Sequence, residues 1–269
     1  MRSSLRRLLL LATIGTVFAL LLPMASASAL DSASSIAASE LHELDLMNAE
    51  RSKAGLVPLR LDTRIAGIAR SRSVYMAKTG VFSHTEKDGS TAFSMIEDAN
   101  ITWYGAGEII AWNSGTDLAG SATYAIDAWM DSSGHRAIIL SKDYNYVGFG
   151  LAQASNGRRY WTGVFLKGPD RTGAYTSMGS PSATGLTTMR SRVIVKWTGL
   201  DPRLQVLTAG LKDYTAQYRR DGEAWLNLGP KTGTSLTLDT WKGHTYTFRV
   251  RARDKSGNWG SWKTATVKL

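Results

Sequence analysis

Apolar residues recur at helical spacing through most of the stretch from Ser39 to Leu140, which predicts a series of amphipathic helices. Capping residues and glycines suggest where each helix begins and ends. The expected limits are Ser39 to Gly55, Asp62 or Thr63 to Gly80, Thr91 to Ala99, and Thr116 to about Trp129. In the third helix, Phe93 and Ile96 are expected to face the core.

After Asp143 the apolar period changes to two, which is typical of strands. The runs Tyr146–Gln153 and Tyr160–Leu166 flank the pair Asn156-Gly157, and both residues of that pair tolerate positive φ. The sequence therefore predicts a β-hairpin, and the first half of the chain is expected to be α+β, with helices covering an antiparallel sheet.

The stretch Gly168–Thr184 is rich in Pro, Gly, Ser and Thr and has no period long enough for an element, so it is expected to be a linker. Short alternating runs follow it, separated by turn signals such as Asp201-Pro202, Asp221-Gly222 and Gly257-Asn258. This spacing predicts an all-β sandwich. The expected organisation is a first domain over 38–168, a linker over 169–184 and a second domain over 185–269.

The N-terminus predicts a cleavable signal peptide over residues 1–29. Three arginines precede the apolar run Leu8–Leu22, and the small residues Ala25–Ala29 follow it. A retained membrane anchor is the weaker alternative, because the run is shorter than the roughly 20 residues of a spanning helix. The mature protein is therefore expected to be secreted, either extracellular or associated with the cell wall, and not membrane-spanning; the export route stays open.

Charge is distributed unevenly along the chain, which has a formal net charge of +10 and no Cys. Residues 29–184 contain 14 basic and 16 acidic residues, whereas residues 185–269 contain 15 basic and 6 acidic ones. Without disulfides, stability must come from apolar burial, and a Cys-free exported chain fits a bacterial producer. The basic excess of the second half predicts attraction to an anionic partner, or a solvated face that aids solubility.

Three residues could carry chemistry in the first half: His84, Glu108 and His135. Two imidazoles and one carboxylate, if they converge, make the ligand set of an open zinc site. Their separations are too long for a local zinc signature, so surface or capping histidines beside a solvated carboxylate are the alternative from spacing alone.

The first half resembles the CAP superfamily, which includes cysteine-rich secretory proteins, antigen 5 and plant pathogenesis-related proteins, and it is most similar to the short bacterial SCP-like branch. The resemblance covers about Glu40–Lys167. It depends on motifs that occur in the family's order: Met47-Asn-Ala-Glu-Arg, Gly55-Leu-Val-Pro-Leu, Phe82-Ser-His, Gly107-Glu-Ile-Ile-Ala-Trp, Ala128-Trp-Met-Asp-Ser-Ser-Gly-His-Arg, Val147-Gly-Phe-Gly and Tyr160-Trp-Thr-Gly-Val-Phe.

The resemblance implies a three-layer α-β-α sandwich with a central cleft that His84, Glu108 and His135 enter, sometimes with bound zinc. This chain departs from the pattern where larger members have a second Glu, because Ser132 stands there with Asp131 beside it. The family's Gly-Glu-Asn motif is also altered, because Ile109 stands in place of its Asn. Family membership does not settle activity, since its members have been linked to lipid and sterol binding, proteolysis and signalling.

The second half resembles a fibronectin type III domain over about Ala183–Leu269. The residues that carry this resemblance are Trp197 and the run Tyr246–Asp254, followed by Gly257-Asn258. Arginines in this half could attract cell-wall polymers or anionic lipids, with nucleic acid disfavoured by location. The candidates are Arg219, Arg220, Arg249, Arg251 and Arg253, of which the last three should share one strand face.

Several side chains have both a functional and a structural interpretation. Two roles compete for four aromatic residues: lining a groove for an apolar ligand or a sugar, and packing in the core. Core packing is the favoured role for this set, which is Tyr144, Tyr146, Tyr160 and Trp161. Sugar stacking competes with edge packing for Trp241, Trp259 and Trp262. Nucleophilic roles compete with capping and turn roles, which are favoured, for Ser83, Ser132 and Ser133.

Three classes of function therefore compete. The first-ranked hypothesis is non-enzymatic binding of a small apolar or cell-envelope ligand in the cleft. The second is a metal-assisted hydrolase in which Glu108 acts as general base on a water polarised by a metal on His84 and His135. The third is an adhesion or interaction protein. The sequence leaves enzymatic activity, the ligand and the oligomeric state open.

Overall fold

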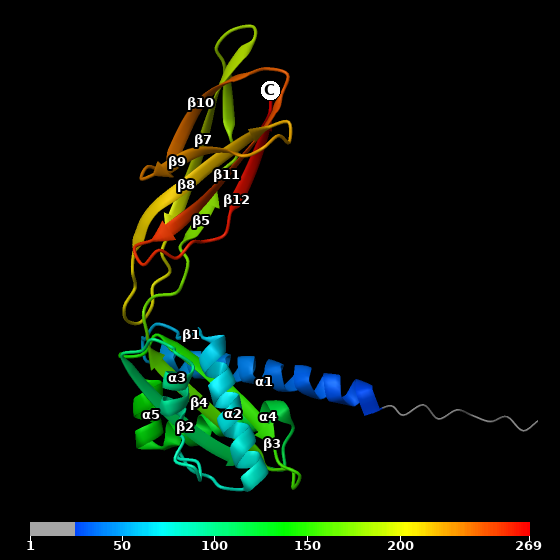
Figure 1. The fold of residues 1–269 in the computed structure, drawn as a ribbon, viewed down its shortest axis with the longest axis vertical. Helices are drawn as coiled ribbons and strands as arrows, with labels where there is room; N and C mark the ends of the chain where they lie inside the picture. Colours follow the sequence, from blue (N-terminus) through cyan, green and yellow to red (C-terminus); the bar gives the residue numbers. More distant parts are fainter. Residues whose placement is uncertain (1–24) are drawn as a thin grey trace, which may run out of the picture.

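The computed structural model describes residues 25–269, which form a helical domain with one small sheet and then a domain of strands alone (Figure 1). Most of the predicted signal peptide, residues 1–24, lies outside the described residues. The first domain contains α1 (Ala25–Lys53), β1 (Arg60–Leu61), α2 (Thr63–Thr79), α3 (Ala92–Asp98), β2 (Gly105–Asn113), α4 (Leu118–Asp131), α5 (Ser133–Ile139), β3 (Tyr146–Gln153) and β4 (Arg159–Lys167). No helix within the described range is both long and apolar enough to cross a membrane.

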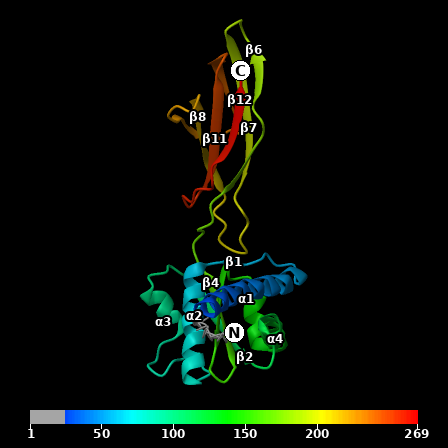
Figure 2. The ribbon, with the colours of Figure 1, turned by 90° about the vertical axis from the view of Figure 1, so that its right-hand side faces the viewer.

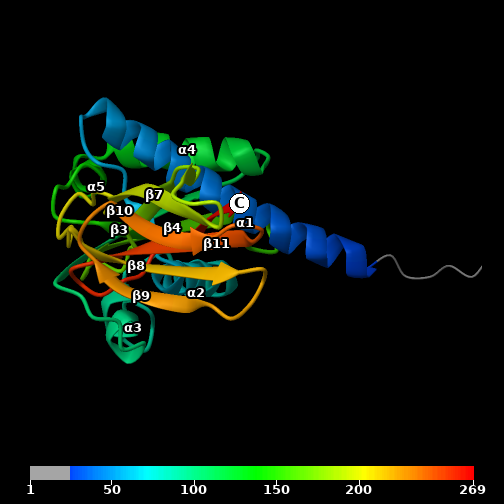
Figure 3. The same cartoon turned by 90° about the horizontal axis from the view of Figure 1, so that it is seen from above.

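The first domain is a three-layer α-β-α arrangement around a four-stranded sheet of order β1-β3-β4-β2 (Figures 2 and 3). One apolar cluster joins α1, α4 and α5 to one face of the sheet, with Met47, Trp129, Phe149 and Trp161 among its buried members. A second cluster joins α2 and α3 to the opposite face. The α+β prediction is confirmed.

Glycines in β3 allow α2 to lie directly against the sheet. A Cβ atom on Gly148 would lie 2.2 Å from the backbone nitrogen of Ala66, and one on Gly150 would lie 2.2 Å from that of Arg70. Ser73 strengthens this contact, since its hydroxyl donates to the Gly150 carbonyl at 2.9 Å. Any side chain at these two strand positions would force the helix away from the sheet.

Two of the helical predictions match closely, since α2 is capped by Asp62 and ends at Gly80 in the left-handed region, and Thr91 caps α3. α1 ends at Lys53, near the expected end, but it begins at Ala25 and not at Ser39. Two further details are wrong. Phe93 does not face the core, because 38% of it is exposed. The side chain that caps α4 is Asp117, not Thr116, and it accepts from the Gly120 nitrogen at 2.7 Å.

The interpretation of residues 39–140 as mainly helical missed β2, which pairs with β4 along its whole length. Five of its nine residues are buried in succession, a pattern that follows from helices covering both faces. A strand buried on both faces loses its alternation and cannot be distinguished by period from a buried helical segment.

The β3–β4 hairpin is confirmed, but its turn differs from the expected one. Ala154 and Arg158 close the loop through a hydrogen bond from Ala154 nitrogen to Arg158 oxygen at 2.8 Å. Only Gly157 has positive φ, at 82°. The loop is therefore longer than two residues and ends on one left-handed glycine.

The second domain consists of two antiparallel sheets of order β10-β7-β5, with β6 also on β7, and β12-β11-β8-β9. Its strands are β5 (Tyr175–Met178), β6 (Ser182–Gly185), β7 (Arg190–Leu200), β8 (Leu211–Arg220), β9 (Leu226–Lys231), β10 (Ser235–Trp241), β11 (Thr245–Asp254) and β12 (Lys263–Lys268). The apolar residues predicted to alternate inward do form one core, including Val193, Trp197, Phe248 and Val250.

The predicted absence of any element in Gly168–Thr184 is wrong, because β5 and most of β6 lie in it. Both strands are short and rich in Ser and Thr, so they show little apolar alternation, and pairing with β7 defines them. The connection between the domains is therefore the short segment from Gly168 to Ala174.

The loop between β7 and β8 packs against the first domain. Leu204 is 2% exposed and belongs to the apolar cluster beneath α2 and α3. The side-chain oxygen of Gln205 accepts from the Val57 nitrogen at 2.8 Å. Asn145 donates to the Val206 carbonyl at 3.3 Å. The two domains are thus joined by packing as well as by the chain.

Candidate functional site

The structure brings two of the three predicted cleft residues into direct contact. Glu108 lies in β2, and His84 lies in the loop that follows α2. The Nδ1 atom of His84 is 2.6 Å from Oε2 of Glu108. The Glu108 side chain is 3% exposed, whereas that of His84 is 54% exposed. The imidazole therefore reaches solvent and the carboxylate lies behind it.

Arg72 of α2 holds this carboxylate from the other side. Its side chain is fully buried, its Nε donates to Oε1 of Glu108 at 3.0 Å, and its Nη1 donates to Glu86 at 2.8 Å. Its Nη2 donates to the Ser83 carbonyl, which fixes the residue next to His84. Burial opposes the charge of Arg72, but hydrogen bonds to Glu86 and Glu108 raise its pKa.

Arg72 was not among the candidate site residues selected from the sequence. The available signal was an arginine among apolar residues on that face, near Ile68 and Met76. A guanidinium is costly to bury without anionic partners, so such a position indicates a paired carboxylate.

Both oxygens of Glu108 are occupied, which changes the chemistry that this residue can perform. Oε1 accepts from Arg72 and Oε2 contacts His84, so each oxygen already has one partner. A carboxylate on Nδ1 favours the tautomer with the proton on that nitrogen and leaves Nε2 as the acceptor. In this arrangement the carboxylate of Glu108 can orient the imidazole of His84.

His135 lies in α5 and faces the same region. Burial lowers the pKa of its imidazole, and the nearby charge of His84 lowers it further. A neutral imidazole can accept a hydrogen bond or bind a metal near neutral pH. His135 and His84 are thus close enough to influence each other.

The residues do not form a three-ligand zinc set. Among the described residues, ligand atoms of His84, Glu108 and His135 do not all lie within 4.8 Å of one another. Because Arg72 and His84 occupy Glu108, only the two imidazoles remain as donors, one fewer than the three protein ligands of a catalytic zinc site. Zinc at this place stays a prediction to be tested by titration.

An elongated groove of about 490 Å³ lies next to His135, between β2 and α4. Its lining includes three of the large aromatic side chains that the first domain leaves exposed: Phe82 at 43%, Trp112 at 41% and Tyr124 at 54%. Trp129, His135 and Ser132 also line the groove. It therefore combines an aromatic wall with a few polar groups, as ligand grooves do.

Sequence reasoning selected other aromatic residues for such a groove. Tyr146, Tyr160 and Trp161 are buried at 4%, 1% and 0% exposure, so core packing, the favoured alternative, is confirmed for them. Tyr144 is half-buried and donates to the Ala106 carbonyl at 3.2 Å. Tyr124 was missed, because one exposed aromatic on a helix has no distinguishing pattern.

The three candidate serines differ in whether they take the expected capping and turn roles or face the groove. The hydroxyl of Ser83 accepts from the Thr85 nitrogen at 3.1 Å, which is the expected turn role. Ser133 is the first residue of α5. Ser132 precedes α5 but makes no side-chain capping bond, and it lines the groove beside His135.

In the second domain, arginines of β8 and β11 lie against tryptophans from the segments that precede β9 and β12. Arg249, Arg251 and Arg253 share one face of β11 as expected, and each guanidinium lies over an indole ring at 4.0 to 4.7 Å, as does that of Arg219. We call this set the Arg–Trp ladder; its members are Arg219, Trp225, Arg249, Trp262, Arg251, Trp259 and Arg253. Arg220 instead pairs with Glu223 at 3.0 Å.

Residues 44–165 match the profile of the cysteine-rich secretory protein family, CAP. The chain is 33% identical over 133 residues to the uncharacterized protein YkwD of Bacillus subtilis, covering 49% of each chain. It is 35% identical over 129 residues to the uncharacterized membrane protein YlbC of the same organism, covering 48% of this chain and 34% of that protein. The chain thus spans half or less of the length of these relatives.

Solved structures give similar matches. An extracellular protein with an SCP domain from Bacillus anthracis is 25% identical, with a TM-score of 0.42, covering 48% of this chain and 40% of that one. An outer surface protein from Borrelia burgdorferi is 20% identical, with a TM-score of 0.41, covering 46% of this chain and 88% of that one.

Proposed function

The first domain of this chain, over residues 44–165, belongs to the CAP family, and we propose that its groove binds a small apolar or amphipathic ligand without catalysing a reaction. The observation that carries this proposal is the gathering of Phe82, Trp112 and Tyr124 at one groove, each more than 40% exposed. Exposed aromatic side chains lose contact with water when an apolar ligand covers them, which favours binding.

The polar residues of the groove suit the head group of such a ligand. His135 and Ser132 line the groove, and His84, whose charge acts on His135, contacts Glu108. A chain with one apolar and one polar end, such as a cell-envelope lipid, matches this division. The ladder and the net positive charge of the second domain would hold the protein near anionic envelope surfaces.

The test is a fluorescence titration of the mature protein with a fluorescent long-chain fatty acid as the probe. We expect Trp112→Ala and Tyr124→Ala each to weaken binding about tenfold, which corresponds to roughly 1.4 kcal/mol. The matched control is Tyr104→Ala, because Tyr104 is 61% exposed and precedes the opposite end of β2. Equal binding by all three variants would contradict the groove as the site.

A hydrolase is the second candidate, and the His84–Glu108 contact favours it. An imidazole held by a buried carboxylate is the arrangement that lets a histidine act as a general base. In this version His84 takes the proton, and Glu108 orients it. Loss of activity on peptides or soluble wall fragments in both His84→Ala and Glu108→Gln, with Trp112→Ala less affected, would support hydrolysis.

A zinc titration by calorimetry distinguishes the metal-assisted form of that hydrolase. Binding that is lost in His84→Ala and in His135→Ala would show that the two imidazoles share a metal. An absence of heat in the parent would exclude the metal-assisted version and leave the metal-free one to be judged by its activity.

The third candidate is adhesion through the second domain, which we propose to be a fibronectin type III-like module. Its two sheets and their strand order support that assignment. The Arg–Trp ladder offers a face that is both cationic and aromatic, suited to acidic sugars or wall polymers. Salt-sensitive binding of the whole chain to isolated cell walls, weakened by Arg251→Ala, would support adhesion. We also propose that the chain is exported, as its N-terminus predicts.

A further inference from the structure

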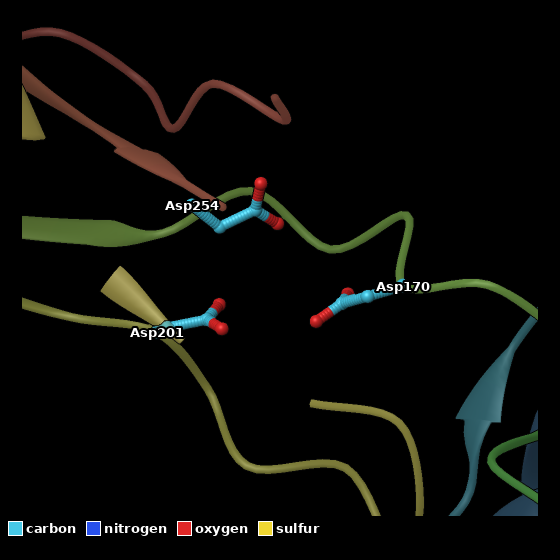
Figure 4. A group of neighbouring side chains, drawn as sticks. All are labelled: Asp170, Asp201 and Asp254. Atoms are coloured by element: carbon cyan, nitrogen blue, oxygen red, sulfur yellow. The ribbon is translucent and has the colours of Figure 1, made fainter. Parts of the chain in front are cut away.

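Three buried aspartates from distant parts of the chain meet where the two domains join (Figure 4). Asp170 lies in the segment between β4 and β5, Asp201 follows β7, and Asp254 ends β11. Their exposed fractions are 5%, 7% and 0%, and their carboxylate oxygens lie within 4.8 Å of one another. Three like charges at this distance repel strongly when water is excluded.

Two of these carboxylates are held in place by backbone and amide donors. Asp170 accepts from the nitrogens of Thr172 and Ala209, each at 2.8 Å. Asp254 accepts from the backbone nitrogen of Asn258 at 2.8 Å and from its side-chain amide at 2.7 Å. Donors of this kind stabilise the ionised form and fix the direction in which the oxygens point.

Asp201 differs, because one of its oxygens is left without a partner. Oδ2 accepts from the Gly210 nitrogen, whereas Oδ1 is buried and has no hydrogen-bond partner. Figure 4 shows the carboxylate of Asp201 directed toward the gap that Asp170 enters from the opposite side. A buried carboxylate oxygen without a partner is costly to leave in that state. This oxygen is an independent indication that a cation belongs at the centre of the three.

No protein cation fills this place. None of the ion pairs found among the described residues involves Asp170, Asp201 or Asp254. Within the described part of the chain, the cluster thus concentrates negative charge without a salt bridge to offset it.

We propose that Asp170, Asp201 and Asp254 bind one calcium ion at the junction between the two domains. The candidate ligands are all carboxylate oxygens, which hard cations prefer, and no nitrogen or sulfur ligand accompanies them. Calcium fits better than magnesium, because three carboxylates held by a loop, a segment and a strand end give an irregular cage. Magnesium demands near-octahedral geometry and keeps most of its water.

The ion would fix the orientation of the second domain on the first. Asp170 belongs to the connection between the domains, and Asp201 and Asp254 belong to the sandwich. The loop after Asp201 also carries Leu204 and Gln205 into the first domain. One divalent ion at this point would therefore stabilise the connecting segment and the docked loop together.

The test is a calorimetric calcium titration of the mature full-length protein after removal of metals with a chelator. We expect one site with a Kd on the order of 10⁻⁴ to 10⁻³ M or tighter, the range of extracellular calcium modules. Asp201→Asn should weaken calcium binding at least about tenfold, since it removes one ligand charge from an anionic cage. The matched control is Asp239→Asn, an exposed aspartate of the same domain, which should bind calcium as the parent does.

A second measurement keeps the proposal falsifiable if Asp201→Asn fails to fold. In limited trypsin digestion of the parent, calcium should slow cleavage at Arg171 in the connecting segment, and magnesium at the same concentration should not. Absence of both calcium heat and protection in the parent would overturn the proposal, as would equal protection by magnesium. A folded Asp201→Asn variant with parental calcium affinity would also overturn it.

Discussion

Arg72 and Arg251 carry the same side chain, yet the two domains use it in opposite ways. Arg72 is fully buried in the CAP domain and is paired with two carboxylates, Glu86 and Glu108. Arg251 lies on the outward face of the sandwich between two indole rings, at 4.4 Å from Trp259 and 4.6 Å from Trp262. Buried charge organises a site in the first domain, and surface charge covers aromatic area in the second.

The difference follows from the solvent around each guanidinium. Removing one partner of a buried pair leaves another charge without water, whereas removing a surface cation leaves its neighbours hydrated. Substitution of an arginine should therefore change the free energy of unfolding by different amounts in the two domains.

The largest effect is expected for Arg72→Ala. Glu86 and Glu108 would lose their buried cation, and we expect the free energy of unfolding to fall by about 3–5 kcal/mol. Urea unfolding followed by the helical circular dichroism signal measures this, because the described helices all lie in the CAP domain. The control is Arg192→Ala, whose exposed pair with Asp239 is screened by water, so this variant should lose far less stability. Similar losses in the two variants would contradict the comparison.

The next largest loss of stability is expected when the close contact between α2, which contains Arg72, and β3 is disturbed. Gly148→Ala would place a Cβ 2.2 Å from the Ala66 nitrogen, so we expect a loss of about 1–3 kcal/mol or more from overpacking. The control is Gly67→Ala on the same helix, where a Cβ meets nothing within 4 Å. That variant should gain roughly 0.5–1 kcal/mol from helix propensity. Thermal unfolding of both variants decides whether the close contact with β3 is needed.

Elements with a clear apolar period could be predicted from the sequence, and those without one could not. α2 was predicted with its cap and end because Asp62 and Gly80 enclose a regular stripe. β2 was missed because helices cover both its faces and remove the alternation. The short strands β5 and β6 were missed because only their pairing with β7 defines them.

In the candidate site, too, some residues could be selected from the sequence and others could not. His84, Glu108 and His135 could be selected from residue type and resemblance, and the structure places His84 against Glu108. The role of Arg72 could not be inferred, because a pairing between residues 36 positions apart has no local signature. The aspartate cluster was missed for the same reason, since Asp170, Asp201 and Asp254 are far apart in the sequence and meet only where the connecting segment folds against the sandwich.

Substitution of Glu43 should give a smaller change in the free energy of unfolding, and one of opposite sign, because this buried acidic residue has no cationic partner. Glu43 in α1 is fully buried, and both its carboxylate oxygens lack hydrogen-bond partners. Burial raises the pKa of Glu43 well above 4.5, and Asp127 raises it further. The folded protein then holds a proton that the unfolded chain releases, so stability falls as pH rises from 4.5 toward the raised pKa.

Glu43→Gln should remove that part of the pH dependence. We expect the variant to gain about 1–2 kcal/mol over the parent at pH 8 and to show little difference at pH 4. Urea unfolding of both proteins across this pH range measures the difference directly. A constant difference at every pH would mean that Glu43 keeps the same proton in the folded and unfolded chains.

The smallest effect is expected for Arg251→Ala in the Arg–Trp ladder. The guanidinium stacks on Trp259 and Trp262 at the surface, so we expect a loss of about 0.5–1 kcal/mol. Tryptophan fluorescence during urea unfolding follows the sandwich. Arg251→Lys should keep most of that stability, because an ammonium also binds an aromatic face, whereas Arg72→Lys should not substitute for Arg72 because it lacks the fork that bridges Glu86 and Glu108. If both Lys variants behaved alike, the distinction between a buried bridging arginine and a stacked surface arginine would be wrong.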